Sequence, residues 1–223
     1  MGIERYRYLA DIVLDILRIS APESKRVLIV GAGAGEEAVA LSQRFPLLDA
    51  IEPNIDGVLP EARSLVRAGT ATALDAPDGC FDIVYCYHVL EHIDEPAIAL
   101  REIRRVLKTD GTLFIGVPNK HRLISYVCVD ENTLRDKVVW NLIDWKMRIL
   151  GRFENRYGAH AGYTRKELSG DLGQLFDTVR DVTQTYYGLK WPGSRMVKLI
   201  SACDVLGEVV WPSIYFVAKR RFS

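Results

Sequence analysis

The sequence has few cysteines and no long apolar run. The four cysteines are Cys80, Cys86, Cys128 and Cys203. No two of them have the Cys-x-x-Cys spacing, and no histidine lies at zinc-finger distance from them. These absences exclude a disulfide scaffold and a zinc cage, so we predict no metal site. No segment approaches the roughly 20 apolar residues of a membrane-spanning helix. Charged residues also interrupt the first 25 residues, where a signal peptide would be apolar. We therefore expect a cytoplasmic protein without a membrane span.

The sequence also lacks net charge, because 29 Lys and Arg residues balance 29 Asp and Glu residues. The balance hides two unequal halves. Residues 1–118 contain 12 basic and 18 acidic residues, a net charge of −6, whereas residues 119–223 contain 17 basic and 11 acidic residues, a net charge of +6. No arginine-rich arm and no basic motif interleaved with aromatic residues occurs, which argues against a nucleic-acid partner.

Short apolar runs alternate with helical patterns over the first half of the chain. The patterns predict an N-terminal helix within residues 1–26, strands over 27–30, 48–52, 81–87 and 112–117, and helices over 36–45, 58–67 and from an N-cap at Asp94 to Lys108. Such alternation indicates βαβ units, and therefore a parallel sheet covered by helices.

After Asn119 the alternation stops. Residues 120–160 carry a long helical pattern, whose apolar face is wide enough either to pack against the domain or to form a lid. Thr164 is a predicted N-cap of the next helix. The remaining chain predicts a strand near 179–186, a helix over 195–210 and a final strand over 214–218.

A glycine-rich loop, Gly31-Ala32-Gly33-Ala34-Gly35, follows the first buried strand. Glycines there allow a ligand to approach the backbone at the start of a helix. Glu52 closes the next strand, 19 residues after Gly33, where a carboxylate can accept hydrogen bonds from ribose hydroxyls. Glu36 stands where a dinucleotide fingerprint has its third glycine, and its charge would repel a pyrophosphate. The loop therefore favours a nucleoside ligand without phosphates over NAD.

Several further motifs follow in a fixed order. They lie at residues 27–35, 51–54, 77–84, 88–93, 100–113 and, more weakly, 162–168. In this order they resemble the class I S-adenosylmethionine (SAM)-dependent methyltransferases, in the branch that includes small-molecule and ubiquinone-biosynthesis enzymes. The resemblance implies an α/β fold with a doubly wound, Rossmann-like, seven-stranded sheet, its last strand antiparallel and helices on both faces. It also implies SAM as the cofactor and methyl transfer to a small-molecule acceptor.

The resemblance divides the chain, as one methyltransferase domain over residues 1–223, into four parts. These are the N-terminal helix (1–26), a cofactor-binding half (27–118), a helical lid insertion (119–163) and C-terminal helices and strands (164–223). We expect this domain to act as a monomer or a homodimer.

The resemblance also assigns roles to residues. It implies that four residues of the loop line the methionine and ribose of SAM: Gly31, Ala32, Gly33 and Gly35. Glu52 would bind the ribose and Pro53 would pack near the adenine. Thr70-Ala71-Thr72 aligns with a stretch whose Asp accepts from the adenine amino group, and Thr70 departs from that pattern. Tyr87 and His88 would border the methionine end and the transferable methyl group.

The catalytic candidate is His160, which precedes the helix that begins after Thr164. The alternative interpretation is that His160 is an ordinary loop histidine without a catalytic role. A base is needed only where the acceptor is a neutral hydroxyl or a protonated amine. We expect oxygen to be the acceptor atom, on a metabolite, a lipid precursor or a sugar. The charge of +6 in residues 119–223 suggests an anionic acceptor, with a carboxylate or phosphate.

Two other functions stay open. Tyr186 and Lys190 have the Tyr-x-x-x-Lys spacing of short-chain NAD(P)-dependent oxidoreductases, but they follow a late strand, and we interpret the spacing as coincidence. The other alternative is a methyltransferase-like domain without catalytic activity that serves as a binding or partner subunit. Only the departure of Thr70 from the family pattern favours it.

Overall fold

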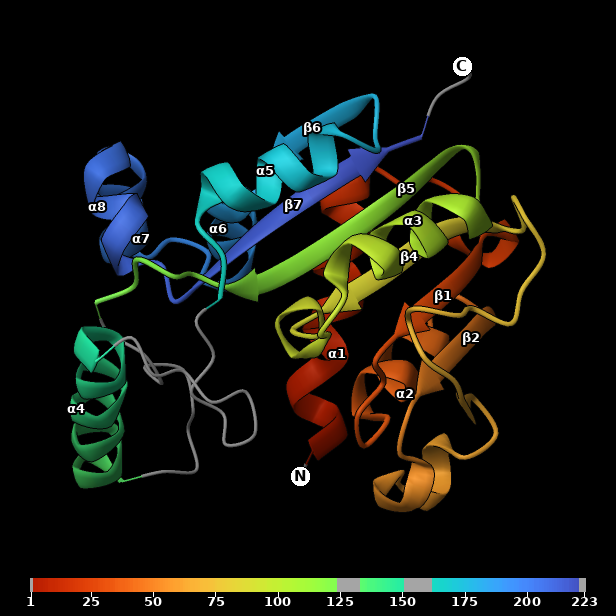
Figure 1. Cartoon of the computed structure of the whole chain (residues 1–223), viewed down its shortest axis with the longest axis horizontal. Coiled ribbons are helices and arrows are strands. Elements are labelled where there is room, and N and C mark those ends of the chain that lie inside the picture. The colour runs from red at the N-terminus through yellow and green to blue at the C-terminus, as the bar shows by residue number, and fades with distance from the viewer. Residues whose placement is uncertain (1, 124–132, 151–161, 221–223) are drawn as a thin grey trace.

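One seven-stranded sheet forms the centre of the protein (Figure 1). The computed structural model describes residues 2–123, 133–150 and 162–220. The strands are β1 (Arg26–Val30), β2 (Leu47–Glu52), β3 (Val66–Ala68), β4 (Phe81–Tyr87), β5 (Leu107–Pro118), β6 (Thr178–Asp181) and β7 (Ser213–Lys219). Their order across the sheet is β3-β2-β1-β4-β5-β7-β6. β7 runs antiparallel to both β5 and β6, and the other pairs are parallel. The predicted sheet, with its antiparallel last strand, is confirmed.

Helices cover both faces of this sheet. The described helices, of which α4 stands away from the sheet, are α1 (Gly2–Leu17), α2 (Glu36–Ser42), α3 (Pro96–Val106), α4 (Leu134–Leu150), α5 (Arg165–Gly173), α6 (Thr183–Lys190), α7 (Arg195–Ser201) and α8 (Asp204–Val210). Alternate residues of β1 point to opposite faces, as they must in a strand. Val27 and Ile29 pack in one core with α1, α2 and α6, whereas Leu28 and Val30 pack in the other with α3 and α5.

Four predicted elements differ from the structure. The helix expected over 58–67 is wrong: Pro60 begins a single 3-10 turn, Pro60–Ala62, and the chain then enters the edge strand β3. The strand near 179–186 ends at Asp181, because its carboxylate accepts from the N–H of Thr183 and α6 begins there.

The helix over 195–210 is two helices, α7 and α8, separated by Ala202 and Cys203. Glu95, and not Asp94, precedes α3, and it provides no side-chain cap. By contrast, the N-cap at Thr164 is confirmed. Its hydroxyl accepts from the N–H of Glu167, whose carboxylate accepts from the N–H of Thr164 in return, which forms a capping box.

A cluster of tyrosines joins the sheet to α6. The rings of Tyr186 and Tyr215 stack with centroids 3.7 Å apart. The hydroxyl of Tyr87, at the end of β4, lies 3.0 Å from that of Tyr186 and 3.3 Å from that of Tyr215. These contacts fix the carboxyl end of β4, beside which the candidate site lies.

The long helix predicted within residues 120–160 is present as α4, which stands apart from the sheet beyond the end of β5 (Figure 1). Apolar side chains on it are about half exposed, among them Val138, Leu142 and Trp145. Trp145 donates to the carbonyl of Leu123 at 2.7 Å, which ties α4 to the segment after β5. Within the described residues, no helix combines the length and the apolar character needed to cross a membrane.

Candidate functional site

The glycine-rich loop links β1 to α2 in a left-handed conformation. Gly31, Gly33 and Gly35 have φ angles of 76°, 53° and 89°. A Cβ atom on Gly31 would lie 2.3 Å from Val89, and one on Gly35 would lie 2.3 Å from Ala62. A Cβ on Gly33 would meet nothing within 4 Å. The loop is therefore packed tightly at both ends and open in the middle, where a ligand can approach its backbone.

Glu52 is held against the loop from the end of β2. The N–H of Gly33 donates to Oε2 of Glu52 at 2.8 Å, and the N–H of Asn54 donates to Oε1 at 3.4 Å. Each carboxylate oxygen can accept more than one hydrogen bond. Glu52 therefore retains acceptor capacity for two neighbouring hydroxyl groups, such as those of a ribose.

A cavity of about 370 Å³ opens beside this loop at the carboxyl ends of the strands. Its lining combines apolar walls with few polar groups: Val30, Gly31, Gly33, Ile51, Glu52, Pro53, Gly69, Thr70, Ala71, Thr72, His88, Val89, His92 and Ile93. The crevice outside the carboxyl ends of parallel strands is where open α/β sheets bind ligands. We call it the main cavity.

Eight of the predicted cofactor residues line the main cavity: Gly31, Gly33, Glu52, Pro53, Thr70, Ala71, Thr72 and His88. Ala32, Gly35 and Tyr87 do not. Gly35 is the N-cap of α2 and packs against Ala62. At the predicted adenine position, the Thr70 hydroxyl lies 3.4 Å from that of Thr72, so the two hydroxyls stand together in place of a carboxylate.

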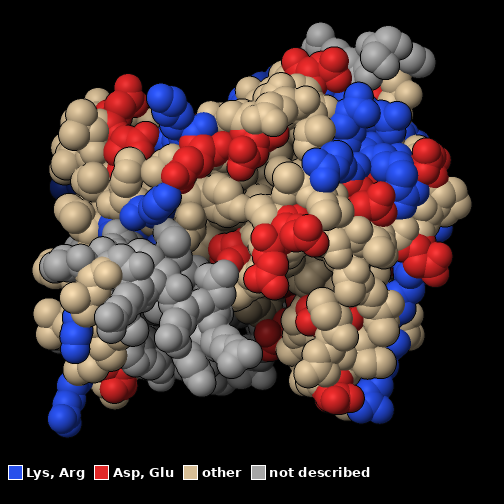
Figure 2. Space-filling view, viewed as in Figure 1, with Lys and Arg blue, Asp and Glu red and all other residues tan. Residues whose placement is uncertain are grey.

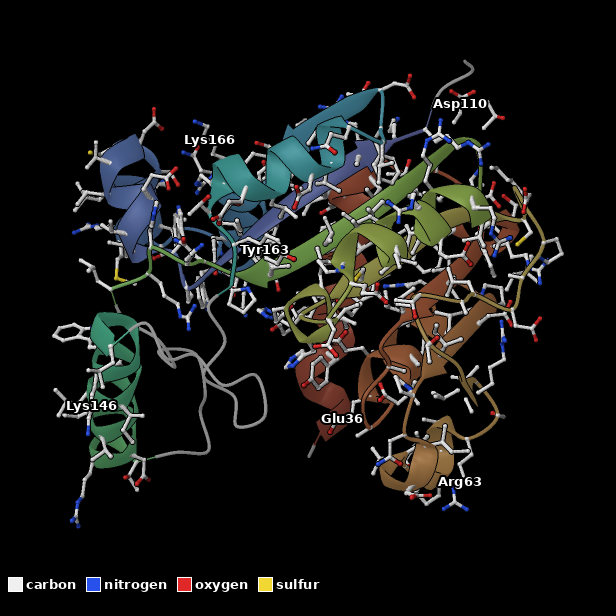
Figure 3. The ribbon with its side chains drawn as sticks, in the orientation of Figure 1. Glu36, Arg63, Asp110, Lys146, Tyr163 and Lys166 are labelled. Carbon is white, nitrogen blue, oxygen red and sulfur yellow. The ribbon has the colours of Figure 1, made fainter. Side chains whose placement is uncertain are left out.

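Ala32 and Tyr87 line a second cavity, of about 320 Å³, which also borders the loop. It shares Gly31, Gly33 and His88 with the main cavity, and its other lining residues are Tyr6, Ala34, Glu36 and Glu37. Figure 3 shows Glu36 beside α1, the helix that contributes Tyr6. The two cavities therefore adjoin one another at the loop and at His88.

Burial raises the pKa of Glu37 to about 8; the nearby Tyr85 hydroxyl opposes this rise and the charge of Glu36 adds to it. The second cavity thus contains a carboxyl group that holds its proton at neutral pH.

The predicted catalytic residue, His160, lies outside the described residues. The segment that follows it docks on the end of β5, where the N–H of Tyr163 donates to the carbonyl of Pro118 at 2.9 Å (Figure 3). Gly162 has a φ of 69°, and a Cβ there would lie 2.2 Å from the same carbonyl oxygen.

Sequence reasoning missed part of the lining and the surroundings of His88. Val89, His92 and Ile93 belong to the motif at 88–93, which signalled the region without showing which side chains face the cavity. Ser213, whose hydroxyl lies 3.3 Å from the His88 ring, comes from β7, and no pattern in the sequence connects the two.

Tyr186 and Lys190 both lie on α6, which follows the late strand β6. Neither lines either cavity. Tyr186 is buried in the tyrosine cluster, and the Lys190 ammonium lies over the rings of Tyr186 and Trp191. Their spacing is thus explained by packing.

The fold is the Rossmann-like α/β arrangement of methyltransferases, and the comparisons with known proteins agree. A family model described as a methyltransferase domain matches residues 28–115. This match, together with the relatives and the fold, supports a class I SAM-dependent methyltransferase with SAM as its cofactor.

The individual relatives share only a moderate sequence identity with this chain. The chain is 33% identical over 114 residues to the uncharacterized methyltransferase YcgJ of Bacillus subtilis, which covers 47% of this chain and 45% of that protein. It is 28% identical over 198 residues to a ubiquinone biosynthesis O-methyltransferase of Parvibaculum lavamentivorans, which covers 83% of this chain and 78% of that protein.

The crystal structure of YcgJ superposes with a TM-score of 0.58 at 20% identity, covering 95% of this chain and 98% of that one. At this identity the likeness shows the fold alone.

Proposed function

We propose that the protein transfers a methyl group from SAM to an oxygen atom of a small-molecule acceptor. The main cavity, with Glu52 held against the open middle of the glycine loop, is the observation that carries this proposal. The similarity to a ubiquinone biosynthesis O-methyltransferase over most of the chain supports oxygen as the acceptor atom.

The residues present fit SAM. The volume of about 370 Å³ lies within the range of small-molecule sites, roughly 300–1,000 Å³. Ile51, Ala71 and Ile93 offer apolar contact to an adenine, and Glu52 offers acceptors to a ribose. Glu36 occupies the first turn of α2, where a pyrophosphate would otherwise bind, so its negative charge disfavours a dinucleotide.

Bound SAM would supply an electrophilic methyl group on a positively charged sulfur. The chain's own contribution is then mainly to position the acceptor in line with that methyl group, because alignment lowers the barrier of a displacement reaction. His88, which lines both cavities, lies where such an alignment can be made. We propose that residues 119–163 cover the acceptor side as a lid, which the place of α4 beyond β5 supports.

The anionic acceptor stays a separate prediction with little support from the two cavities. Neither has Lys or Arg in its described lining. Figure 2 shows Lys and Arg gathered over the C-terminal end of α3, where Arg101, Arg104, Arg105 and Arg220 surround another hollow. In the second half of the chain, Arg165 pairs with Asp181 and Lys120 with Glu167.

Calorimetric titration with SAM, S-adenosylhomocysteine and NADPH tests the proposed function. We expect binding of the first two only. Binding of NADPH alone would overturn the proposal in favour of an oxidoreductase, and binding of none would indicate a domain that has lost the cofactor. Transfer of label from methyl-labelled SAM to a panel of phenols, hydroxy acids, sugars and amines then identifies the acceptor atom. Turnover at low and high salt tests whether the acceptor is anionic.

A further inference from the structure

His88 has a strained backbone at the point where the two cavities meet. Its φ angle is 55°, in the left-handed region that non-glycine residues seldom adopt. The residue is held there by its own N–H, which donates to the carbonyl of Gly116 on β5 at 2.8 Å. Backbone strain of this kind concentrates at functional sites, where it aims a side chain that a relaxed backbone would point elsewhere.

The strained backbone places the imidazole between a carboxylate and a hydroxyl. Nδ1 of His88 lies 3.4 Å from Oε1 of Glu91, and Nε2 lies 3.3 Å from Oγ of Ser213. The ring also makes an edge contact with Tyr87, with centroids 4.6 Å apart. The His88 side chain is 32% exposed, whereas that of Glu91 is 2% exposed. The partly exposed imidazole of His88 thus lies between the buried carboxylate of Glu91 and the hydroxyl of Ser213.

Glu91 determines which ring nitrogen is free to accept a proton. A carboxylate accepts hydrogen bonds and donates none, so the nitrogen facing it, Nδ1, is the one that bears hydrogen. Nε2 then keeps its lone pair and accepts from the Ser213 hydroxyl. The second oxygen of Glu91, Oε2, is buried and has no hydrogen-bond partner among the described residues. The carboxylate therefore has capacity to stabilise a positive charge on the ring.

We propose that His88 is the catalytic base of the methyl transfer, accepting the acceptor's proton on Nε2, with Glu91 as its positioning residue. The inference rests on the proposed function. In the step, a lone pair of the acceptor's oxygen forms a bond to the methyl carbon, and the bond from that carbon to sulfur breaks with its electron pair remaining on sulfur. The proton on the oxygen passes to Nε2 and then to solvent, while Ser213 gives up its place at Nε2 to the acceptor.

The titratable groups that contact His88 or share its cavities come from five elements: Tyr6 on α1, Glu36 and Glu37 on α2, Glu52 on β2, Tyr87 on β4, and Glu91 and His92 in the turn after β4. Glu91 makes the closest of the described charged contacts to the ring, so its substitution is the sharpest test of positioning.

The central variant is His88→Asn, because Asn tolerates a positive φ and cannot accept a proton at neutral pH. We expect kcat to fall by about 10²–10⁴-fold, the usual contribution of a general base, with the Kd for S-adenosylhomocysteine within about threefold of the wild type. Asp110→Asn is the matched control. Asp110 also has a positive φ, 63°, but it lines neither cavity. We expect wild-type turnover from it.

A matched pair of acceptors separates proton removal from positioning. Phenol keeps its proton at pH 8, whereas thiophenol has largely lost its proton to water and needs no base. We expect His88→Asn to lose turnover of phenol and to keep turnover of thiophenol. Glu91→Gln should show the same pattern more weakly. Equal losses on both probes, or wild-type turnover of phenol by His88→Asn, would overturn the role of His88.

Nitrogen-15 NMR of the imidazole tests the same inference without any acceptor. In the protein saturated with S-adenosylhomocysteine at pH 8, we expect hydrogen on Nδ1 and a free lone pair on Nε2, and a shift away from this tautomer in Glu91→Gln. Hydrogen on Nε2 in the wild type would refute the proposal even if neither probe is turned over. Failure to bind SAM or S-adenosylhomocysteine would instead refute the proposed function itself.

Discussion

At the scale of single residues, we predict that Glu52 contributes most to binding the cofactor. Its carboxylate accepts from the N–H of Gly33 at 2.8 Å and lines the main cavity. We predict that Glu52→Ala weakens SAM binding by about 10–100-fold, because hydrogen bonds to a charged group contribute about 1.5–3 kcal/mol. Calorimetry measures this change. Asp49→Ala, on the same strand but in an exposed pair with Arg26, is the control and should bind SAM normally.

The glycines of the loop differ from one another in a way that stability can reveal. Alanine at Gly31 or at Gly33 requires the same left-handed backbone, at a cost of about 1–2 kcal/mol. Only at Gly31 does the new Cβ also collide with Val89. We predict that Gly31→Ala lowers the free energy of unfolding by about 1–3 kcal/mol more than Gly33→Ala does. Urea unfolding measures the free energy of unfolding of both variants. Equal losses would show that the loop or Val89 shifts to accommodate the new Cβ at Gly31.

At the scale of elements, the capping box of α5 joins a short helix to the end of β5. Thr164→Ala removes the hydroxyl that accepts from Glu167, and we predict a loss of about 1 kcal/mol in the free energy of unfolding. Ser169→Ala, in the body of the same helix, should cause no loss, because alanine is the better helix former. Equal effects from the two variants would show that the cap adds nothing.

The elements also show what local sequence can predict. The strands β1, β4 and β7 were predictable because each is a short, fully apolar or alternating run that the sheet buries. The edge strand β3 was not, since its three residues make no pattern and gain their place only by pairing with β2. Likewise α7 and α8 share one helical pattern, and only packing separates them at Ala202.

The same division applies to the site. The glycine loop and Glu52 lie at the ends of adjacent strands, so their meeting follows from the predicted βαβ unit. His88 and Ser213 are brought together by the antiparallel register of β5 and β7, in which Pro118 faces Ser213. Register between strands that are distant in sequence is set by the whole sheet, and no local pattern specifies it.

At the scale of the whole molecule, one buried carboxyl group makes stability depend on pH. The pKa of Glu37 is about 8 in the folded protein, against 4.5 for the free side chain. Between these values the folded state binds one proton more than the unfolded state, so stability falls as pH rises through this window and levels off above it. The slope approaches about 1.4 kcal/mol per pH unit.

We predict that Glu37→Gln removes this slope and is more stable than the wild type at pH 8.5, while Glu23→Gln, at an exposed position, retains the slope. Unfolding by urea at several pH values between about 5 and 9 measures it. Parallel pH profiles for the wild type and Glu37→Gln would show that the Glu37 carboxyl is ionised in the folded protein at neutral pH.

The place of β7 in the sheet has a consequence for how the protein folds while it is being synthesised. β7 fills the gap between β5 and β6, although 95 positions separate Pro118 from Ser213. A ribosome adds roughly 5–20 residues per second, so the nascent chain carries an open edge on β5 for roughly 5–20 s. Such an edge can pair with other chains. We therefore expect the yield of folded protein to fall when translation of the second half of the message is slowed.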